Sequence, residues 1–208
     1  MQGETASQSV ARAVKLVRGR HYESARTVCL KLCKGDQTNA QIWMLLGICN
    51  GQLGLYQEAV DAFRRVVKLA PEQPFSHLNL AKALHAKGEL DAAASSYQHA
   101  LNIDKTLAEA WDGLGQLKVS KKELPAAERC FRNIIALHPG DAGAYHKLAA
   151  AVNEEDKWQE ALELYTKATE LQPDLAEAWN NLGVIQQKHG QLKESALSYR
   201  KALAAKPA

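Results

Sequence analysis

The chain has 208 residues, of which 46% are hydrophobic, and its 26 Lys and Arg residues barely outnumber its 23 Asp and Glu residues. This balance is too even to indicate binding to nucleic acid or to an anionic membrane by charge alone. No window is apolar over the ~18 residues that a membrane-spanning helix needs, and residues 1–25 lack the apolar core of a secretory signal, so we expect a cytoplasmic protein.

A pattern of small and bulky apolar residues recurs every 34 residues along the chain. It is clearest where AEAWDGLG at residues 108–115 returns as AEAWNNLG at residues 176–183. Weaker copies lie at half that spacing, and a period of this length indicates an array of stacked repeats. The register gives six repeats without insertions, which begin at Ala6, Ala40, Pro74, Ala108, Ala142 and Ala176.

The first half of each repeat predicts a helix that carries packing residues. A bulky residue is followed three positions later by Leu and then by Gly or Ala, as in WMLLG at residues 43–47. Residues three apart share one face of a helix, and the small residue lets a second helix approach closely. We therefore expect the bulky residues, Trp43, Trp111 and Trp179 among them, to pack rather than to bind a ligand. Three repeats then have a glycine that can end this helix in a left-handed conformation: Gly54, Gly88 and Gly190.

The second half of each repeat predicts a partner helix. Ala, or Ser in the last repeat, is followed four positions later by an aromatic residue in five of the six repeats, which forms a stripe on one face. Pro125 suits the first turn of such a helix. Four repeats have a late proline that can end it: Pro71, Pro139, Pro173 and Pro207.

Trp-x-x-Leu-Gly, then Ala, an aromatic residue and a late Pro, repeated every 34 residues, resembles the tetratricopeptide repeat (TPR) family. The resemblance implies an all-α fold, a right-handed superhelical solenoid of stacked antiparallel helix hairpins. It covers residues 6–208 as a single array, after a flexible N-terminus of residues 1–5. The first repeat departs furthest, since Ser9, Arg12 and Gln37 replace the bulky residue, the Leu and the Pro, and we interpret it as a capping repeat.

The resemblance also implies a concave groove, lined by the first helices, that binds a peptide segment or a helix of a partner protein. We also expect Val10 and Val14 to line this groove, which should be apolar toward the N-terminus and polar toward the C-terminus. An exposed apolar surface often marks a binding site. The alternative for each residue is that it packs between successive repeats. The expected groove residues are Met44, Ile48, Phe75, Leu78, Asn79, Lys82, Asp112, Gln116, His146, Lys147, Asn180, Asn181 and Lys188.

Asn79 and Asn181 occupy a position at which members of this family can bind a peptide backbone. A carboxamide suits this role because it offers both an acceptor and two donors. Other residues interrupt a regular ladder of such asparagines: Ala11, Leu45, Gly113 and Lys147. The Lys-x-x-x-Arg element by which some family members bind chaperone tails is absent, so such tails are not expected ligands.

No pattern in the sequence points to catalysis or to metal binding. Cys29 and Cys33 are four residues apart, but free cysteines usually pack in the core, and no second pair lies at zinc-like spacing. Possible acid–base pairs are His85 with Glu89 and His146 with Glu154, yet nothing marks a nucleophile or an oxyanion site beside them. We therefore predict a chain that is not an enzyme, with no catalytic residue, metal or cofactor.

We predict a protein-interaction scaffold whose partner is another protein or peptide, with no nucleic acid and no membrane insertion. One alternative is the substrate-recognition module of a larger enzyme of the glycosyltransferase, sulfotransferase or methyltransferase type. Another is an adaptor that dimerises through the ends of the array, because no further helix covers the last repeat. Residues 1–39 carry 7 basic and 3 acidic residues, whereas residues 142–175 carry 3 basic and 7 acidic residues, a contrast that could steer a partner.

Overall fold

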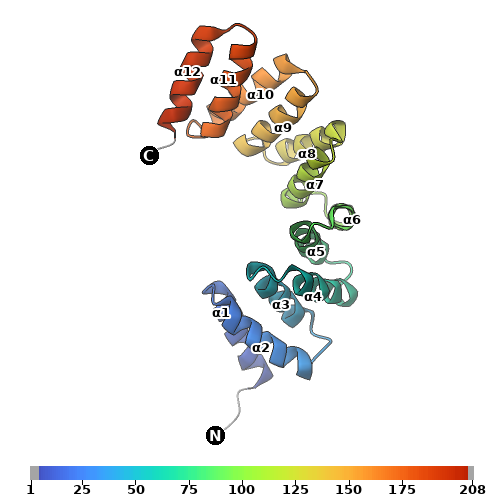
Figure 1. Ribbon diagram of the computed structural model, residues 1–208. Helices are drawn as coiled ribbons and strands as arrows, with labels where there is room; N and C mark the ends of the chain where they lie inside the picture. Colours follow the sequence, from blue (N-terminus) through green and yellow to red (C-terminus); the bar gives the residue numbers. More distant parts are fainter. Residues whose placement is uncertain (1–4, 206–208) are drawn as a thin grey trace. The chain divides into compact units, whose positions relative to one another are not determined.

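The computed structural model describes residues 5–205, and helices are the only regular secondary structure among them (Figure 1). The helices are α1 (Ala6–Arg18), α2 (Tyr22–Gly35), α3 (Ala40–Gln52), α4 (Tyr56–Leu69), α5 (Pro74–Lys87), α6 (Leu90–Ile103), α7 (Ala108–Ser120), α8 (Leu124–Leu137), α9 (Ala142–Glu154), α10 (Trp158–Leu171), α11 (Ala176–Lys188) and α12 (Leu192–Ala204). The odd-numbered helices begin at the six residues at which the register places the repeat starts. An all-α helical-repeat fold is therefore confirmed.

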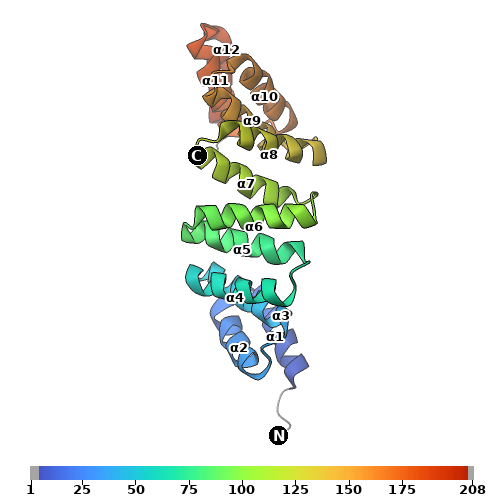
Figure 2. The same cartoon turned by 90° about the vertical axis from the view of Figure 1, so that its right-hand side faces the viewer.

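The chain divides into two compact units, an N-terminal unit that ends at Ala110 and a C-terminal unit that begins at Trp111. In the N-terminal unit, α1 packs on α2, α3 on α4 and α5 on α6, and α2 also packs on α3 and α4 on α5. The same alternation runs from α8 to α12 in the C-terminal unit. Figure 2, turned by 90° from Figure 1, also shows the two helices of these pairs next to each other.

The buried residues follow the repeat register. The small residue of each second helix is fully buried in five repeats: Ala25, Ala59, Ala93, Ala127 and Ala161. The residue four positions later is at most 5% exposed in the same repeats: Cys29, Phe63, Tyr97, Phe131 and Tyr165. The stripe expected on the second helix is therefore the core of each unit.

The bulky residue of the first helix has a second role that its size does not reveal. In three repeats, a ring nitrogen of this residue lies within hydrogen-bond distance of the backbone carbonyl six positions earlier. The pairs are Trp43 Nε1 with Gln37 O at 3.0 Å, His77 Nε2 with Pro71 O at 2.8 Å, and Trp179 Nε1 with Pro173 O at 2.9 Å. This bond ties each first helix to the loop that precedes it.

The first repeat forms a helix pair despite its divergent sequence. Thr5 caps α1: its Oγ1 accepts from the Gln8 backbone N–H at 3.3 Å, and Gln8 Oε1 accepts from the Thr5 backbone N–H at 2.8 Å. Such a capping box satisfies two backbone donors at the start of a helix. Thr5 is the one described residue of the expected flexible N-terminus; residues 1–4 and Pro207 lie outside the described range.

Every first helix is followed by a residue in the left-handed conformation. Gly54, Gly88 and Gly190 have φ angles of 75°, 91° and 77°, as expected. The other three repeats place a non-glycine residue at the same register: Arg20 at 59°, Lys122 at 59° and Asp156 at 61°. The turn is thus common to all six repeats, although only three of them carry the glycine that predicts it.

We expect Arg20→Gly to raise the free energy of unfolding by about 1 kcal/mol. The left-handed conformation costs an L-residue ~1–2 kcal/mol, a cost that glycine avoids, although its more flexible unfolded chain offsets part of the gain. Gly54 is the matched control, because open space surrounds the position of its missing Cβ. Gly54→Ala should therefore destabilise the chain by a similar amount through backbone strain alone. Urea unfolding of both variants tests this, and a destabilised Arg20→Gly variant would contradict it.

Candidate functional site

In the N-terminal unit, four of the predicted groove residues lie together on α3 and α5. Asn79 Nδ2 donates to Phe75 O at 2.9 Å and lies 3.4 Å from Met44 Sδ. Ile48, Asn79 and Lys82 line a shallow pocket of about 340 Å³. The Asn79 amide nitrogen is occupied by its own helix, so its carbonyl oxygen is the group that it can offer to a ligand.

Leu78 is a correction to the predicted set. Its side chain is 1% exposed, whereas Phe75, one turn earlier on α5, is 55% exposed. At the same register, Met44, Asp112 and His146 are half-buried and Asn180 is exposed. At this partly covered position, an aliphatic side chain that turns into the core lowers the free energy of the folded state, because its apolar surface leaves water. Leu78 therefore belongs to the core and offers no surface to a partner.

In the C-terminal unit, three predicted residues form a polar network. Lys147 Nζ lies 2.5 Å from Asp112 Oδ1, and Gln116 Nε2 donates to Asp112 Oδ2 at 2.7 Å. The Asp112 carboxylate thus holds one residue on its own helix and one on α9. Lys188, at the end of α11, is exposed and makes no ion pair within the described part of the chain.

A pocket of about 530 Å³ lies between α9, α11 and α12 and gathers three of the predicted residues. We call it the asparagine pocket, and it is lined by His146, Ala176, Glu177, Asn180, Asn181, Tyr199, Ala202 and Leu203. Asn181 Nδ2 lies 3.1 Å from His146 Nε2 and 3.3 Å from Tyr165 Oη. Asn180 is exposed, so both its side-chain carbonyl oxygen and its side-chain NH2 group can reach a ligand.

The electrostatics of the asparagine pocket favour uncharged side chains in its wall. Burial lowers the pKa of His146, against the opposing effect of Glu177, so its imidazole is neutral at pH 7. Its Nε2 then accepts from Asn181, which places the imidazole proton on Nδ1. Burial also raises the pKa of Tyr165 to about 12. Apart from the Glu177 carboxylate, the pocket wall therefore presents neutral donors and acceptors, the groups that match a peptide backbone.

Sequence reasoning missed five residues that line this pocket, Ala176, Glu177, Tyr199, Ala202 and Leu203. Tyr199 and Leu203 lie on α12, and second helices were expected to supply packing residues alone. The register holds no signal for Leu203, because its equivalent Leu101 is the same residue type, although Leu101 is 1% exposed and Leu203 is 76% exposed.

The cysteines behave as core residues. All four are buried and free, and burial raises the pKa of Cys33 and of Cys130 to about 11. A hydrogen bond with Cys49 raises the pKa of Cys29. Thiols with a raised pKa stay protonated at pH 7 and are poor nucleophiles and metal ligands.

Neither candidate acid–base pair finds its expected partner. Glu89 instead pairs with Lys87 and Arg64, and Glu154 lies 2.8 Å from Lys122 Nζ. Across residues 5–205, no group of three or more His, Cys, Asp or Glu side chains could hold a metal ion. None of the helices described is both long and apolar enough to cross a membrane.

Comparison with known proteins identifies repeats along much of the chain. One tetratricopeptide repeat family model matches residues 10–74 and 52–108, a second matches residues 176–208, and a TPR repeat model matches residues 153–190. Together these matches cover more than half of the chain.

Two curated relatives share about a quarter of their aligned residues with the chain. Tetratricopeptide repeat-containing protein trd-1 of Caenorhabditis elegans is 26% identical over 166 residues, which are 76% of this chain and 21% of the relative. Protein O-mannosyl-transferase TMTC1 of Homo sapiens is 26% identical over 168 residues, 79% of this chain and 19% of the relative. The chain therefore spans about a fifth of the length of these proteins.

Solved structures share the fold over most of the chain. A crystal structure of MamA is 27% identical, with a TM-score of 0.73, and the match covers 77% of this chain and 94% of MamA. YrrB, described as a TPR protein with an unusual peptide-binding site, is 23% identical with a TM-score of 0.73 over 84% of this chain and 90% of YrrB. The likeness to YrrB shows the fold alone.

Proposed function

Because the chain belongs to the tetratricopeptide repeat family, we propose that it is a non-catalytic protein-interaction scaffold that binds a peptide segment or helix on the faces of its first helices. The asparagine pocket carries this proposal, because the predicted residues His146, Asn180 and Asn181 meet there around a cavity of about 530 Å³. The proposal rests on this site and not on the fold, because fold alone does not assign chemistry.

The pocket chemistry supports a peptide as ligand. Exposed Asn180 offers a donor and an acceptor that match one peptide unit. Tyr199 and Leu203 supply apolar surface beside it, which suits the side chain next to the bound peptide unit. Polar groups that fix orientation within a partly apolar concavity are typical of ligand sites.

The N-terminal unit offers a second surface of the same kind. Met44 and Ile48 on α3 are half-buried, and Lys82 on α5 is paired with Glu109 at 2.6 Å. This surface combines the apolar side chains of Met44 and Ile48 with the charged side chain of Lys82. We therefore assign the remaining predicted residues of the first helices, except the buried Leu78, to the same function.

Selection of peptides from a displayed random library, using the purified chain as bait, tests the proposal. We expect the selected peptides to bind Asn180→Arg at least about tenfold more weakly, because the longer charged side chain fills the pocket. Gln159→Arg is the matched control: it makes the same change in charge at an exposed position on α10 and should leave binding unchanged. Failure to select any peptide, or peptides insensitive to Asn180→Arg and to changes on α3 and α5, would contradict the function.

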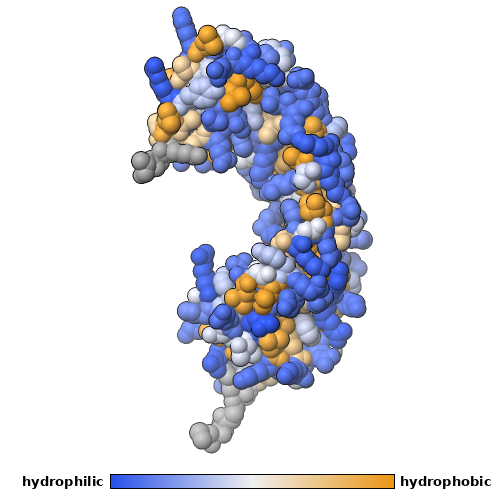
Figure 3. Space-filling view, in the orientation of Figure 1, coloured by the Kyte–Doolittle hydropathy of each residue, from blue (hydrophilic) through white to orange (hydrophobic). Residues whose placement is uncertain are grey.

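A second candidate is self-association through α12. Leu192 and Leu203 are 65% and 76% exposed on this helix. Figure 3 shows hydrophobic surface among the hydrophilic side chains near the C-terminal end of the chain. At the register of Leu203, Cys33, Leu101 and Thr169 are at most 6% exposed. A second copy that covers α12 would bury this apolar surface. Light scattering over a concentration series should then detect a dimer, and a monomer throughout would exclude this candidate.

Three further predictions concern a larger enzyme, the location of the protein and nucleic acid as a partner. A role as recognition module of a larger enzyme is not favoured, because the O-mannosyl-transferase relative is distant, with 26% identity. The cytoplasmic location and the absence of nucleic acid among the partners also stay predictions.

A further inference from the structure

A groove of about 990 Å³ lies in the N-terminal unit, away from every residue of the asparagine pocket. It runs along α1 and is closed by the end of α2 and the start of α3. Its apolar lining is aliphatic: Val10, Val14, Leu32 and Ile42. The three residues other than Ile42 are half-buried, so part of this apolar surface remains open to a ligand.

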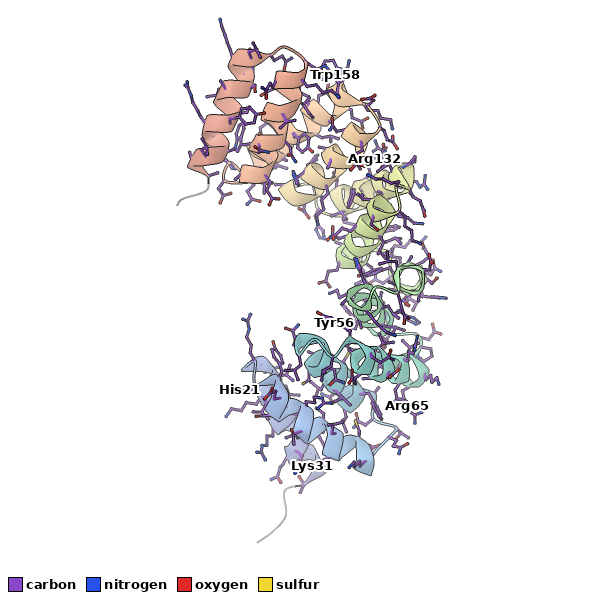
Figure 4. All side chains as sticks on the ribbon, viewed as in Figure 1. His21, Lys31, Tyr56, Arg65, Arg132 and Trp158 are labelled. Carbon is purple, nitrogen blue, oxygen red and sulfur yellow. The ribbon has the colours of Figure 1, made fainter. Side chains whose placement is uncertain are left out.

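The charged residues of this N-terminal groove are mostly basic. Lys15, Arg18 and Lys31 line it together with a single acid, Asp36 (Figure 4 labels Lys31 on α2). The Asp36 carboxylate is already occupied, because Oδ1 accepts from the Thr38 backbone N–H at 2.9 Å and from its hydroxyl at 2.8 Å. None of the three cations forms an ion pair within residues 5–205. The groove therefore combines an apolar surface with a net positive charge, three cations against one carboxylate.

The repeat register indicates that Lys15 does not stand there as an ordinary packing residue. Its equivalents in the other five repeats are apolar and buried: Cys49, Ala83, Leu117, Ala151 and Ile185. Lys15 is exposed, and it places a charge at the edge of the groove where each later repeat has a core side chain. The divergent first repeat thus has its own binding chemistry in addition to its role in capping.

We propose that the N-terminal groove binds an acidic peptide segment of a partner protein. Aliphatic side chains of the peptide would pack against Val10 and Val14. Its carboxylates would face Lys15, Arg18 and Lys31. Charge complementarity selects the partner: the three cations form no ion pair within residues 5–205, and Asp36 is the one acid that lines the groove with them. The aliphatic lining favours a protein over a nucleic acid, because no aromatic side chain lines the groove for base stacking. The proposal adds a second ligand class to the proposed scaffold function and shares no residue with the asparagine pocket.

The test uses the full chain carrying Asn180→Arg, so that the asparagine pocket is blocked, as bait for a displayed library of random peptides. We expect the selected peptides to be enriched in Asp and Glu beside aliphatic residues. Lys15→Glu combined with Lys31→Glu should weaken their binding by about tenfold or more, and the effect should shrink at high salt. Lys68→Glu, at an exposed position on α4 of the same unit, is the matched control and should leave binding unchanged.

Circular dichroism establishes that each variant retains its helices before binding is compared. Peptides that lack acidic enrichment, or that bind the double variant and the control equally well, would overturn the proposal. So would an RNA oligonucleotide that binds in place of any peptide and is lost in the double variant. If peptides still bind the native chain through Asn180, the scaffold function survives and only the acidic groove fails.

Discussion

Replacement of Gly47 by leucine should lower the free energy of unfolding by about 3 kcal/mol, the upper end of the usual cost of overpacking a core. Gly47 lies on α3 at the small-residue position of its repeat, where it faces α4. A Cβ built at this residue would lie 2.6 Å from Phe63 Cε1 and 2.7 Å from Phe63 Cζ. Phe63 is 5% exposed, so its ring has little room to move away.

Gly51, one turn later on the same helix, provides the control. No atom lies within 4 Å of the position of its missing Cβ. Gly51→Ala should therefore stabilise the chain by about 0.5–1 kcal/mol, because alanine has the higher helix propensity. Urea unfolding of the two variants should give opposite signs. A Gly47→Leu variant as stable as the native chain would show that the close approach of α3 and α4 does not depend on this glycine.

The close approach at Gly47 also shows why the fold could be predicted from the sequence. The same position is Gly115 in the fourth repeat, where a Cβ would lie 2.7 Å from Phe131 Cε1. A small residue opposite an aromatic residue is a local signal for helix packing, and it recurs at a fixed period. Repetition makes such a signal readable even where one copy, like the first repeat, has lost most of it.

The left-handed turns show one limit of predicting the fold from residue types. Glycine predicts this conformation at Gly88, but Arg20 and Lys122 adopt it although neither residue type favours it. Their conformation is imposed by the packing of the two helices that each turn connects. A pattern based on residue types cannot detect a geometry that is fixed by tertiary contacts.

The candidate site was harder to predict because exposure depends on neighbouring helices. Met44 and Leu78 share a register, yet the first is half-buried and the second is 1% exposed. Tyr165 and Tyr199 also share a register, but Tyr165 Oη contacts Asn181 whereas Tyr199 Oη donates to Gln187 Oε1 at 2.9 Å. Helical periodicity identifies the face on which a residue lies, but not the partner that it finds there.

A buried carboxylate in the C-terminal unit leads to the last prediction. Glu128 on α8 is 4% exposed, with Lys157 Nζ at 2.8 Å and Arg132 Nη1 at 2.5 Å (Figure 4 labels Arg132). Arg132 also pairs with Glu160 at 2.8 Å, so the network links α8 to α10. Burial alone would raise the pKa of Glu128, but the hydrogen bonds from Lys157 and Arg132 outweigh it and lower the pKa.

Glu128→Gln should lower the free energy of unfolding by about 2 kcal/mol at pH 7. Hydrogen bonds to a charged group contribute ~1.5–3 kcal/mol, and we take the lower part of that range because Lys157 and Arg132 are each 47% exposed and partly screened by water. Glu163→Gln, at an exposed position on α10, is the control and should change stability by less than ~0.5 kcal/mol.

The sign of the pH dependence follows from the lowered pKa of Glu128. In the unfolded chain this carboxyl titrates near its ordinary pKa of ~4.3, so the unfolded state binds the proton first as the pH falls. The stabilisation is therefore complete above that value and is lost as the pH falls through the lower pKa of the folded state. The difference in the free energy of unfolding between the native chain and Glu128→Gln should accordingly become smaller at acidic pH. Urea unfolding at a series of pH values measures it, and a difference that stays constant would mean that the Glu128 side chain stabilises α8 by its shape rather than by its charge.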